Sequence, residues 1–396
     1  MEKREIRVTQ LEFGMYVAEL DRPWTETPFM FQGFVLRTEQ QLTALRKFCK
    51  YVFVDPEKSE KLAAPGGGLV VRGTTAYPET TPVEVEYAQA TTAYAQSADS
   101  VAQLLAPLAR PDGVLEARAV KESVARLADS VVRNPDALLL VSRLRETSAA
   151  AHARALQVSV YMLVFARFLQ LRRDELELLG LLGLLQDVGK TRLPAAIMEK
   201  KGALTDAESE IARQHVEHSA EILSHTPGLS PRLPELARLH HERQDGTGYP
   251  RGLKGEEIGL YGSIAAIADT FDALTAPRPY AEALSPSSAL SYLYKERGTG
   301  YHGELVEQFI QCVGAFPVGS VVELNSGEVG IVITQNLVRR LKPRVMVVLD
   351  SKGDPMRPHK ILDLDKDPKA NPDEVYRIRR SMESTKVQVD PRELFL

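Results

Sequence analysis

Apolar residues recur at helical spacing through the middle of the chain, from about residue 86 to residue 316. One such run consists of Leu156, Val160, Leu163, Val164, Phe168 and Leu171. Side chains three or four positions apart lie on one face of a helix, so this run predicts a helix packed against a core. Thr205 and Glu208 form a capping box, which predicts the start of a second helix that carries His215.

Both ends of the chain show strand patterns instead. A β-rich run at residues 52–54 follows a helical pattern at residues 39–50, which predicts a small α/β domain. Further on, two apolar runs flank Asn325-Ser326-Gly327, which is typical of a β-hairpin, and residues 344–349 predict another strand. We therefore expect a multi-domain protein that is mainly an α-helical bundle, with a small α/β domain before it and a short β unit after it.

The expected domain boundaries follow these changes of pattern. A small accessory domain occupies residues 1–62, and a linker rich in glycine and proline occupies residues 63–85. The helical domain takes residues 86–316. A β extension then spans residues 317–363, and a loosely held polar tail spans residues 364–396.

The composition narrows the classes of function. The 396 residues include 53 acidic and 49 basic side chains, and the net charge of −4 disfavours a general nucleic-acid binder. Cys49 and Cys312 are two lone cysteines far apart, which excludes a disulfide framework and a cysteine-rich zinc module. The most apolar stretch, residues 176–185, is too short to cross a bilayer, and no secretion signal is visible. We expect a cytoplasmic protein without a membrane span.

Histidines and acidic residues gather in one part of the helical domain. Five of the eight histidines lie between residues 215 and 241, and Asp187 and Asp269 flank them. Each of these acids ends an apolar run, where a buried carboxylate needs a compensating cation. A divalent metal shared with imidazoles would supply one, since His and Asp together suit Fe, Mn, Zn or Ni. A plain ion pair with Lys or Arg is an equal alternative on spacing alone.

The pair His240-His241 precedes a long polar loop, ERQDGTGYP. An isolated pair is more often a helix end decorated with imidazoles, which the helix dipole favours. Here the glycines Gly246 and Gly248 allow a ligand to approach the backbone, and Tyr249 offers a stacking face. This context favours a binding site.

The sequence leaves two interpretations open for the pair His215 and His218 and for Lys190. His215 and His218 lie one helical turn apart, and we expect at most one of them to be functional. Lys190 follows Asp187 by three residues, where it can either meet a phosphate as a point charge or simply pair with that carboxylate.

Three segments together resemble the HD-GYP family, bacterial phosphodiesterases of the HD superfamily that open the second messenger cyclic di-GMP. The segments are LLQDVGKTRLP, HHERQDGTGYPRGLKGEEI and IAAIADTFDALTAPRPY, and the resemblance covers about residues 140–316. Residues 1–62 resemble the small domain of unknown function that often precedes such domains. The resemblance implies a helical HD fold, cyclic di-GMP as ligand, and two or three ions, usually iron or manganese, that generate a nucleophilic water.

Several residues take roles from this resemblance by their motif positions. Asp187 corresponds to the bridging metal ligand and, with Lys190, to the catalytic pair. The remaining expected metal ligands are His215, His240, His241 and Asp269. The expected substrate-binding residues are Arg154, Lys190, Gly246, Gly248, Tyr249, Pro250 and Arg278. Asp272 resembles a residue that supports the turn of Asp269.

The chain departs from the family pattern at four positions. The defining His-Asp pair is Gln186-Asp187, Arg154 stands at a ligating histidine, Ala150 at an acidic ligand, and Ala281 at a basic residue. A guanidinium cannot bind a metal and stays protonated, so Arg154 would repel a second cation. It would pair with Asp187 or Asp269, or hold a phosphate. We expect one divalent ion, Fe or Mn, or none. Losing the bridging hydroxide costs roughly a thousandfold or more in rate.

Three hypotheses follow. The first is a degenerate member that binds cyclic di-GMP or a partner protein, such as a diguanylate cyclase, with weak or absent hydrolysis. The second is a working phosphodiesterase, yielding pGpG or GMP, in which Arg154 clamps the phosphate. The third is a scaffold that binds no nucleotide. A homodimer is compatible with all three.

Overall fold

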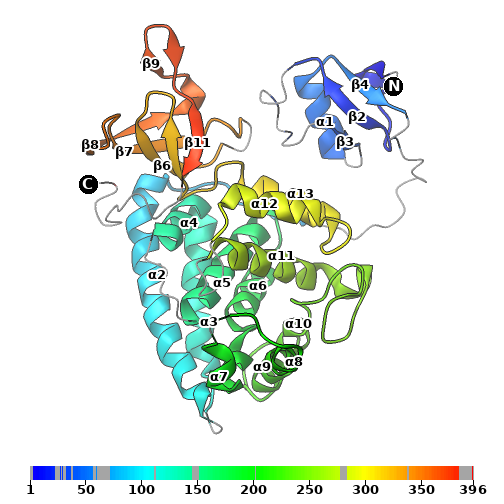
Figure 1. The fold of residues 1–396 in the computed structure, drawn as a ribbon, viewed down its shortest axis with the longest axis vertical. Coiled ribbons are helices and arrows are strands. Elements are labelled where there is room, and N and C mark those ends of the chain that lie inside the picture. Colours follow the sequence, from blue (N-terminus) through cyan, green and yellow to red (C-terminus); the bar gives the residue numbers. More distant parts are fainter. Residues whose placement is uncertain are drawn as a thin grey trace.

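The structure is a computed structural model of a multi-domain, mainly helical protein (Figure 1). It describes residues 3–22, 27, 29, 33–36, 39–56, 59, 72–110, 113–144, 151–200, 202–276, 283–336, 339–382 and 395. A helical domain is flanked by an amino-terminal α/β domain and a carboxy-terminal β-sheet. The expected fold class is confirmed.

The helical domain extends from Val83 to Val313. Its helices are α2 (Val83–Leu105), α3 (Ala117–Arg133), α4 (Pro135–Leu144), α5 (Ala151–Phe168), α6 (Arg173–Leu185), α7 (Ala195–Met198), α8 (Asp206–Arg213), α9 (His215–Ser224), α10 (Leu233–Ala237), α11 (Gly259–Thr275), α12 (Pro286–Lys295) and α13 (Gly303–Val313). Short 3-10 helices η3 (Ala106–Ala109), η4 (Val188–Arg192) and η5 (Gly255–Ile258) connect some of them.

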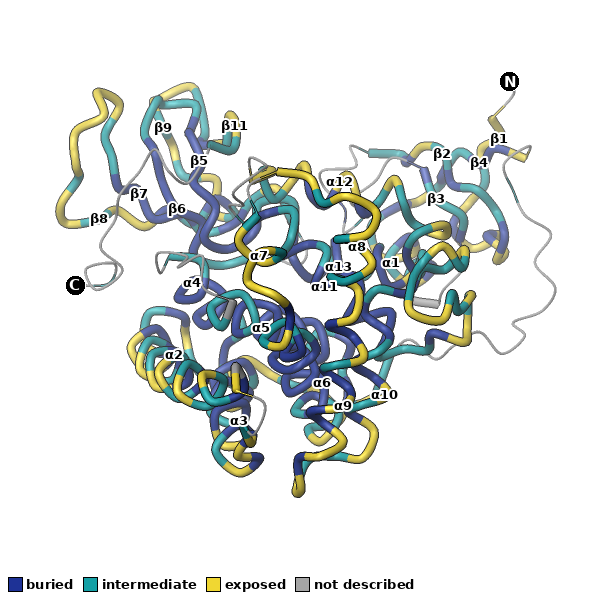
Figure 2. The backbone as a smooth tube through the Cα atoms, turned by 60° about the horizontal axis from the view of Figure 1, so that its bottom comes forward, coloured by how far each residue is buried: buried dark blue, intermediate teal, exposed yellow. Residues whose placement is uncertain are grey.

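Two glycines let α5 and α6 pack closely at the centre of this domain. A Cβ at Gly180 would lie 2.7 Å from Leu163, and one at Gly183 would lie 2.8 Å from the backbone of Ser159. The Ser159 hydroxyl donates to the carbonyl of Gly180 at 2.7 Å. Helix α6 is buried over most of its length, as its dark colour in Figure 2 shows. The apolar run at residues 176–185 is therefore a core helix.

The amino-terminal domain contains a four-stranded antiparallel sheet in the order β1-β4-β2-β3. Its elements are β1 (Arg4–Arg7), η1 (Val8–Gln10), β2 (Tyr16–Leu20), β3 (Phe34–Val35), α1 (Glu39–Phe48) and β4 (Tyr51–Asp55). Leu42 and Leu45 of α1 share a core with Val17 and Val52 of the sheet. The predicted helix and strand at residues 39–54 are both present.

The carboxy-terminal domain is a five-stranded antiparallel sheet in the order β11-β5-β6-β7-β8. Its elements are β5 (Val321–Leu324), β6 (Val329–Thr334), β7 (Arg344–Leu349), β8 (Pro355–Asp363), η6 (Leu364–Lys366), β9 (Lys369–Asn371), β10 (Glu374–Val375) and β11 (Ile378–Met382). Val321 pairs with Ile331, which confirms the predicted hairpin.

Two expectations about connecting segments need correction. The polar tail expected from residue 364 carries strands as far as Met382, because β11 pairs with β5 at the edge of the sheet. Of the linker expected at residues 63–85, the structure describes residues 72–85, and α2 already begins at Val83. There the Gly73 N–H donates to the carbonyl of Leu169 at 2.8 Å, and the Tyr77 hydroxyl donates to that of Leu171 at 2.8 Å.

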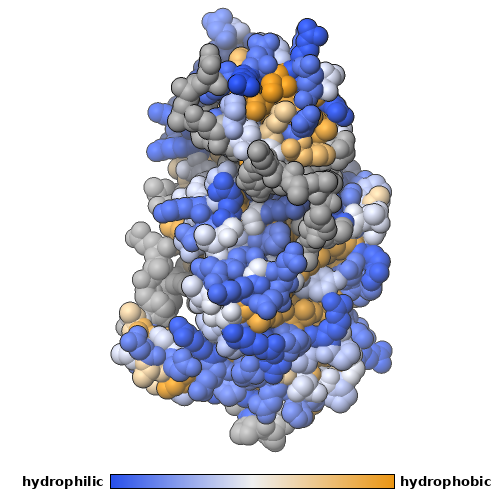
Figure 3. Space-filling view, turned by 90° about the vertical axis from the view of Figure 1, so that its right-hand side faces the viewer, coloured by the Kyte–Doolittle hydropathy of each residue, from blue (hydrophilic) through white to orange (hydrophobic). Residues whose placement is uncertain are grey.

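The face of the molecule shown in Figure 3 is largely hydrophilic. In the view of Figure 3, hydrophobic atoms gather in small separate patches. None of the described helices combines the length and apolar character that crossing a membrane requires.

Candidate metal site

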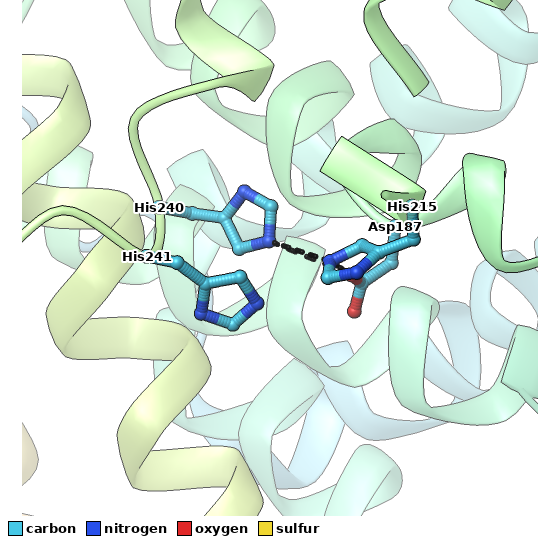
Figure 4. A group of neighbouring side chains, drawn as sticks. All are labelled: Asp187, His215, His240 and His241. Carbon is cyan, nitrogen blue, oxygen red and sulfur yellow. Dashed lines mark hydrogen bonds and ion pairs between the residues drawn. The ribbon is translucent and has the colours of Figure 1, made fainter. Parts of the chain in front are cut away.

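Four side chains from separate elements converge in the helical domain. Asp187 lies between α6 and η4, His215 begins α9, and His240 and His241 follow α10. One ligand atom from each lies within 4.8 Å of the others. Figure 4 shows the three imidazoles and the carboxylate turned toward one another. The structure thus gathers four of the five residues expected to bind metal.

The sequence brings η4 close to α9 through Gly189. A Cβ at this position would lie 2.2 Å from the carbonyl oxygen of His215, so only glycine allows this approach. The Gly189 N–H donates to the Ser219 hydroxyl at 2.8 Å. This contact places Asp187 beside the first residue of α9.

The capping box of Thr205 and Glu208 is confirmed at the start of α8. The predicted helix, however, does not continue through His215, because it breaks at Gln214 and α9 begins at the next residue. The break separates α8 from the helix that carries the ligand.

Hydrogen bonds fix the tautomers of two imidazoles. Nδ1 of His215 lies 2.6 Å from the carbonyl oxygen of Ala212, and Nδ1 of His240 lies 2.7 Å from that of Ala237. A carbonyl oxygen only accepts, so each Nδ1 carries a proton, and it is the Nε2 atom that each ring presents to a cation when it acts as a ligand. Such backbone contacts are how metal-binding histidines are held.

Three acceptor atoms therefore face one another. Oδ1 of Asp187 lies 3.1 Å from Nε2 of His215 and 3.5 Å from Nε2 of His240, and the two nitrogens are 3.4 Å apart. Lone pairs at these distances repel unless a cation lies between them. A proton on one ring can bridge two of the atoms, whereas a metal ion can bridge all three. The donor set fits one divalent ion.

The protonation states agree with this fit. Burial alone would raise the pKa of Asp187, but the positive charge of Lys190 is the largest of the opposing effects that hold that pKa well below its usual value. Burial and the neighbouring His240 lower the pKa of His241 well below its usual range. The carboxylate is ionised and this third imidazole is neutral, as metal binding requires.

The second carboxylate oxygen of Asp187 is already engaged. Nζ of Lys190 donates to Oδ2 at 2.6 Å. Of the two interpretations of Lys190, the ion pair is therefore present in this structure. Because an ammonium contacts Oδ2, that oxygen is not free to bridge toward a second ion.

Arg154 of α5 points toward the acidic face of α11. Its Nε donates to Oδ2 of Asp272 at 3.1 Å. Neither of the expected partners, Asp187 and Asp269, is the hydrogen-bond partner of Arg154, because the carboxylate that it reaches lies one turn beyond Asp269 on the same helix. Both acids nevertheless help to raise the pKa of Arg154. Burial raises the pKa of Asp272 to about 6, although Arg154 opposes this shift. Asp269 is buried nearby but is not in the four-residue group.

Gln186 is buried in the position where the family has a histidine. The residue is only 1% exposed, and neither its amide nitrogen nor its amide oxygen has a hydrogen-bond partner among the described residues. Leaving such groups unpaired costs about 1–3 kcal/mol each.

Glu242 is a residue of this site that sequence reasoning missed. Its buried carboxylate accepts hydrogen bonds from the N–H groups of Arg251 at 2.8 Å and Leu253 at 3.0 Å. These bonds close the polar loop after His241. Gly248 packs so tightly that a Cβ there would lie 2.4 Å from the backbone nitrogen of Arg243. The position of this glutamate directly after the histidine pair could have indicated its role from the sequence.

The closed loop places Tyr249 on the histidines. Its ring stacks on His241 with centroids 4.7 Å apart, and the Arg213 guanidinium lies 5.1 Å from its centroid. Burial raises the pKa of Tyr249, and Asp187 and Asp269 raise it further. The hydroxyl stays protonated and able to donate. Pro250 follows through a cis peptide bond, and Gly246 has a φ of +81°.

One further histidine considered in the sequence, His218, lies apart from the cluster. His218 is on α9 outside the four-residue group, so at most one of His215 and His218 contributes to it. Arg278, Ala281 and Ala150 lie outside the described residues.

Three family profiles match the chain. One described as HD domain covers residues 139–305, a domain of unknown function (DUF3391) covers residues 3–156, and a KOW domain associated with HD domain covers residues 321–374. The KOW match overlaps the carboxy-terminal sheet.

The relatives are phosphodiesterases by name. The chain is 32% identical over 369 residues to "Cyclic di-GMP phosphodiesterase PA4108" of Pseudomonas aeruginosa, which covers 91% of this chain and 89% of that protein. It is 38% identical over 147 residues to "Cyclic di-GMP phosphodiesterase response regulator RpfG" of Xanthomonas campestris, covering 37% of this chain and 39% of that protein. A solved HDG"Y"P protein from Bdellovibrio bacteriovorus, Bd1817, has a TM-score of 0.48 at 14% identity and covers 78% of this chain and 98% of its own.

Proposed function

Because the chain belongs to the HD-GYP family, we propose that it binds cyclic di-GMP beside Asp187 and hydrolyses it weakly or not at all. The observation that carries this proposal is the position of Arg154, whose guanidinium pairs with Asp272 where the family pattern has a metal-ligating histidine. A permanent cation at this place opposes the binding of a second metal ion.

The proposed site holds one divalent ion, iron or manganese. Asp187, His215, His240 and His241 would bind it, and Asp269 joins them as a proposed ligand whose position is outside the four-residue group. The ion would act as a Lewis acid on a phosphate oxygen. A bridging hydroxide needs two ions, so we propose that this nucleophile is missing.

The residues of the chain would bind the nucleotide. Among the described residues, Arg154 bonds only to Asp272 and only through Nε, which leaves its two terminal nitrogens for a phosphate. Lys190 would contact the phosphate as a point charge. The Tyr249 hydroxyl would donate to it, while Gly246, Gly248 and Pro250 shape the loop around the ligand. Arg278 stays a predicted phosphate contact.

A second candidate is a working phosphodiesterase with an altered site. The four-residue cluster favours it, since one ion and two guanidinium nitrogens can together neutralise a phosphodiester in the transition state. In that case Arg154→Ala abolishes turnover, because Arg154 replaces the second ion.

One experiment separates these functions. Purified protein is loaded anaerobically with Mn²⁺ or Fe²⁺, its metal content is measured, and cyclic di-GMP is added. Calorimetry that detects binding, with turnover at least about a thousandfold below a fully liganded family member, is the expected result. Turnover equal to that member refutes the degenerate site. The absence of any binding leaves the scaffold hypothesis. Size-exclusion chromatography, with and without a diguanylate cyclase, tests for a homodimer and for that partner.

A further inference from the structure

Arg213 ends α8 at the edge of the metal site. Its guanidinium carbon lies 5.1 Å from the centroid of the Tyr249 ring, and that ring stacks on His241 at 4.7 Å. A single aromatic ring therefore connects Arg213 to a proposed metal ligand. Stacking on an aromatic face holds a guanidinium in a defined orientation, which lowers the entropy lost when it binds a ligand.

The charge of Arg213 is more available than the charges of Lys190 and Arg154, which also lie near the cluster. Lys190 contacts Asp187 at 2.6 Å, and Arg154 contacts the buried carboxylate of Asp272 at 3.1 Å. Among the described residues, Arg213 forms an ion pair with Glu210 at 3.5 Å.

The pair of Arg213 and Glu210 is a surface pair. The Arg213 side chain is 52% exposed and that of Glu210 is 72% exposed. Such pairs are weak, because water and salt screen them. An anionic ligand can therefore displace Glu210 from the guanidinium at little cost.

We propose that Arg213 binds the second phosphate of cyclic di-GMP, while the metal cluster and Arg154 receive the first. This inference rests on the proposed function. The ligand carries two phosphodiesters on one macrocycle, so a site that neutralises one phosphate leaves the other at its rim. A guanidinium can hold that phosphate through two parallel hydrogen bonds. Arg213 therefore selects ligands that carry two phosphates over those that carry one.

The test compares Arg213→Gln and Arg213→Lys with the wild type in calorimetric titrations of cyclic di-GMP and of GMP, which has one phosphate. Arg118→Gln is the matched control, because Arg118 is an exposed arginine paired with Glu122 on α3. We expect Arg213→Gln to raise the Kd for cyclic di-GMP about tenfold and to leave that for GMP unchanged. Arg213→Lys keeps the charge and loses the paired hydrogen bonds, so its Kd for cyclic di-GMP should lie between those of the wild type and Arg213→Gln.

The salt dependence gives an independent readout. The Kd of the wild type for cyclic di-GMP should rise more steeply with ionic strength than that of Arg213→Gln, because the variant lacks one screened contact. Equal losses for both ligands, or an unchanged Kd and salt dependence in Arg213→Gln, would overturn the inference. If the wild type binds no cyclic di-GMP, the proposed function itself fails, and this inference fails with it.

Discussion

The proton positions on His215 and His240 determine what the cluster can bind. Both Nδ1 atoms donate to backbone carbonyls, so both Nε2 atoms face Oδ1 of Asp187 as acceptors. The arrangement is preorganised for a cation, since the backbone of α8 and α10 orients the rings.

Replacement of one ring should therefore remove the ion. In His215→Ala, we expect the affinity for Mn²⁺ to fall by at least about a hundredfold, because a direct ligand contributes more than the outer partners that typically account for 10–100-fold. Calorimetric titration of the metal-free protein measures this. His225→Ala, a change at an exposed histidine at the end of α9, is the control and should bind like the wild type.

Two substitutions should restore a second ion. Arg154→His together with Gln186→His removes the guanidinium and supplies two imidazoles beside Asp187, so we expect the bound metal to rise from one ion per chain to two. Elemental analysis after anaerobic loading measures the ratio. Gln186→His alone is the control and should stay at one ion. A wild type that already holds two ions would contradict the one-ion proposal.

At the scale of elements, Gly189 lets η4 approach the backbone of α9 closely. The close approach of Gly189 to the backbone of His215 fixes the distance between Asp187 and that histidine.

Gly189→Ala should consequently damage both stability and metal binding. The added methyl group would overlap the His215 carbonyl, which we expect to lower the free energy of unfolding by about 1–3 kcal/mol. Chemical denaturation measures the loss, and a Mn²⁺ titration should show weaker binding. In Gly300→Ala the nearest atoms lie 3.6 Å away, so this control should change neither quantity.

Short sequence motifs predicted the elements whose ends depend on contacts between neighbouring residues. The capping box located the start of α8, and the Asn-Ser-Gly turn located the hairpin of β5 and β6. The pattern missed β11, whose sequence IRRSM is polar, because an edge strand needs little apolar surface and gains its hydrogen bonds from β5.

The candidate site likewise has a part that the sequence predicted and a part that it did not. The motifs indicated Asp187 and the three histidines, which lie in three short segments of the sequence. The contacts of Arg154 with Asp272 and of Arg213 with Tyr249 join residues on different elements. The spacing of residues along the sequence therefore does not predict these contacts.

At the scale of the whole molecule, a buried carboxylate joins the helical domain to the carboxy-terminal sheet. Oδ2 of Asp136, on α4, accepts a hydrogen bond from the backbone N–H of Gln335 at 3.0 Å, just beyond β6. Burial raises the pKa of Asp136 to about 7; nearby Glu79 adds to the rise, and Arg167 opposes it.

This group should make stability depend on pH. Between about pH 4 and pH 7 the folded chain keeps a proton on Asp136 that the unfolded chain has lost, so stability falls as the pH rises through that window. Asp136→Asn does not titrate and still accepts the bond from Gln335. We expect the free energy of unfolding of the variant, relative to that of the wild type, to increase by on the order of 3 kcal/mol between pH 4 and pH 8. Thermal melts at both pH values measure this, and a constant difference would contradict it.

Covalent attachment distinguishes the guanidinium of Arg154 from any ion beside it. Chelators cannot extract it, oxidation cannot change its charge, and it needs no supply from the surroundings. The occupancy of the metal site formed by the histidines would depend on the concentration of available iron or manganese. The positive charge facing Asp272 is in place as soon as the chain has folded, whether or not metal is at hand.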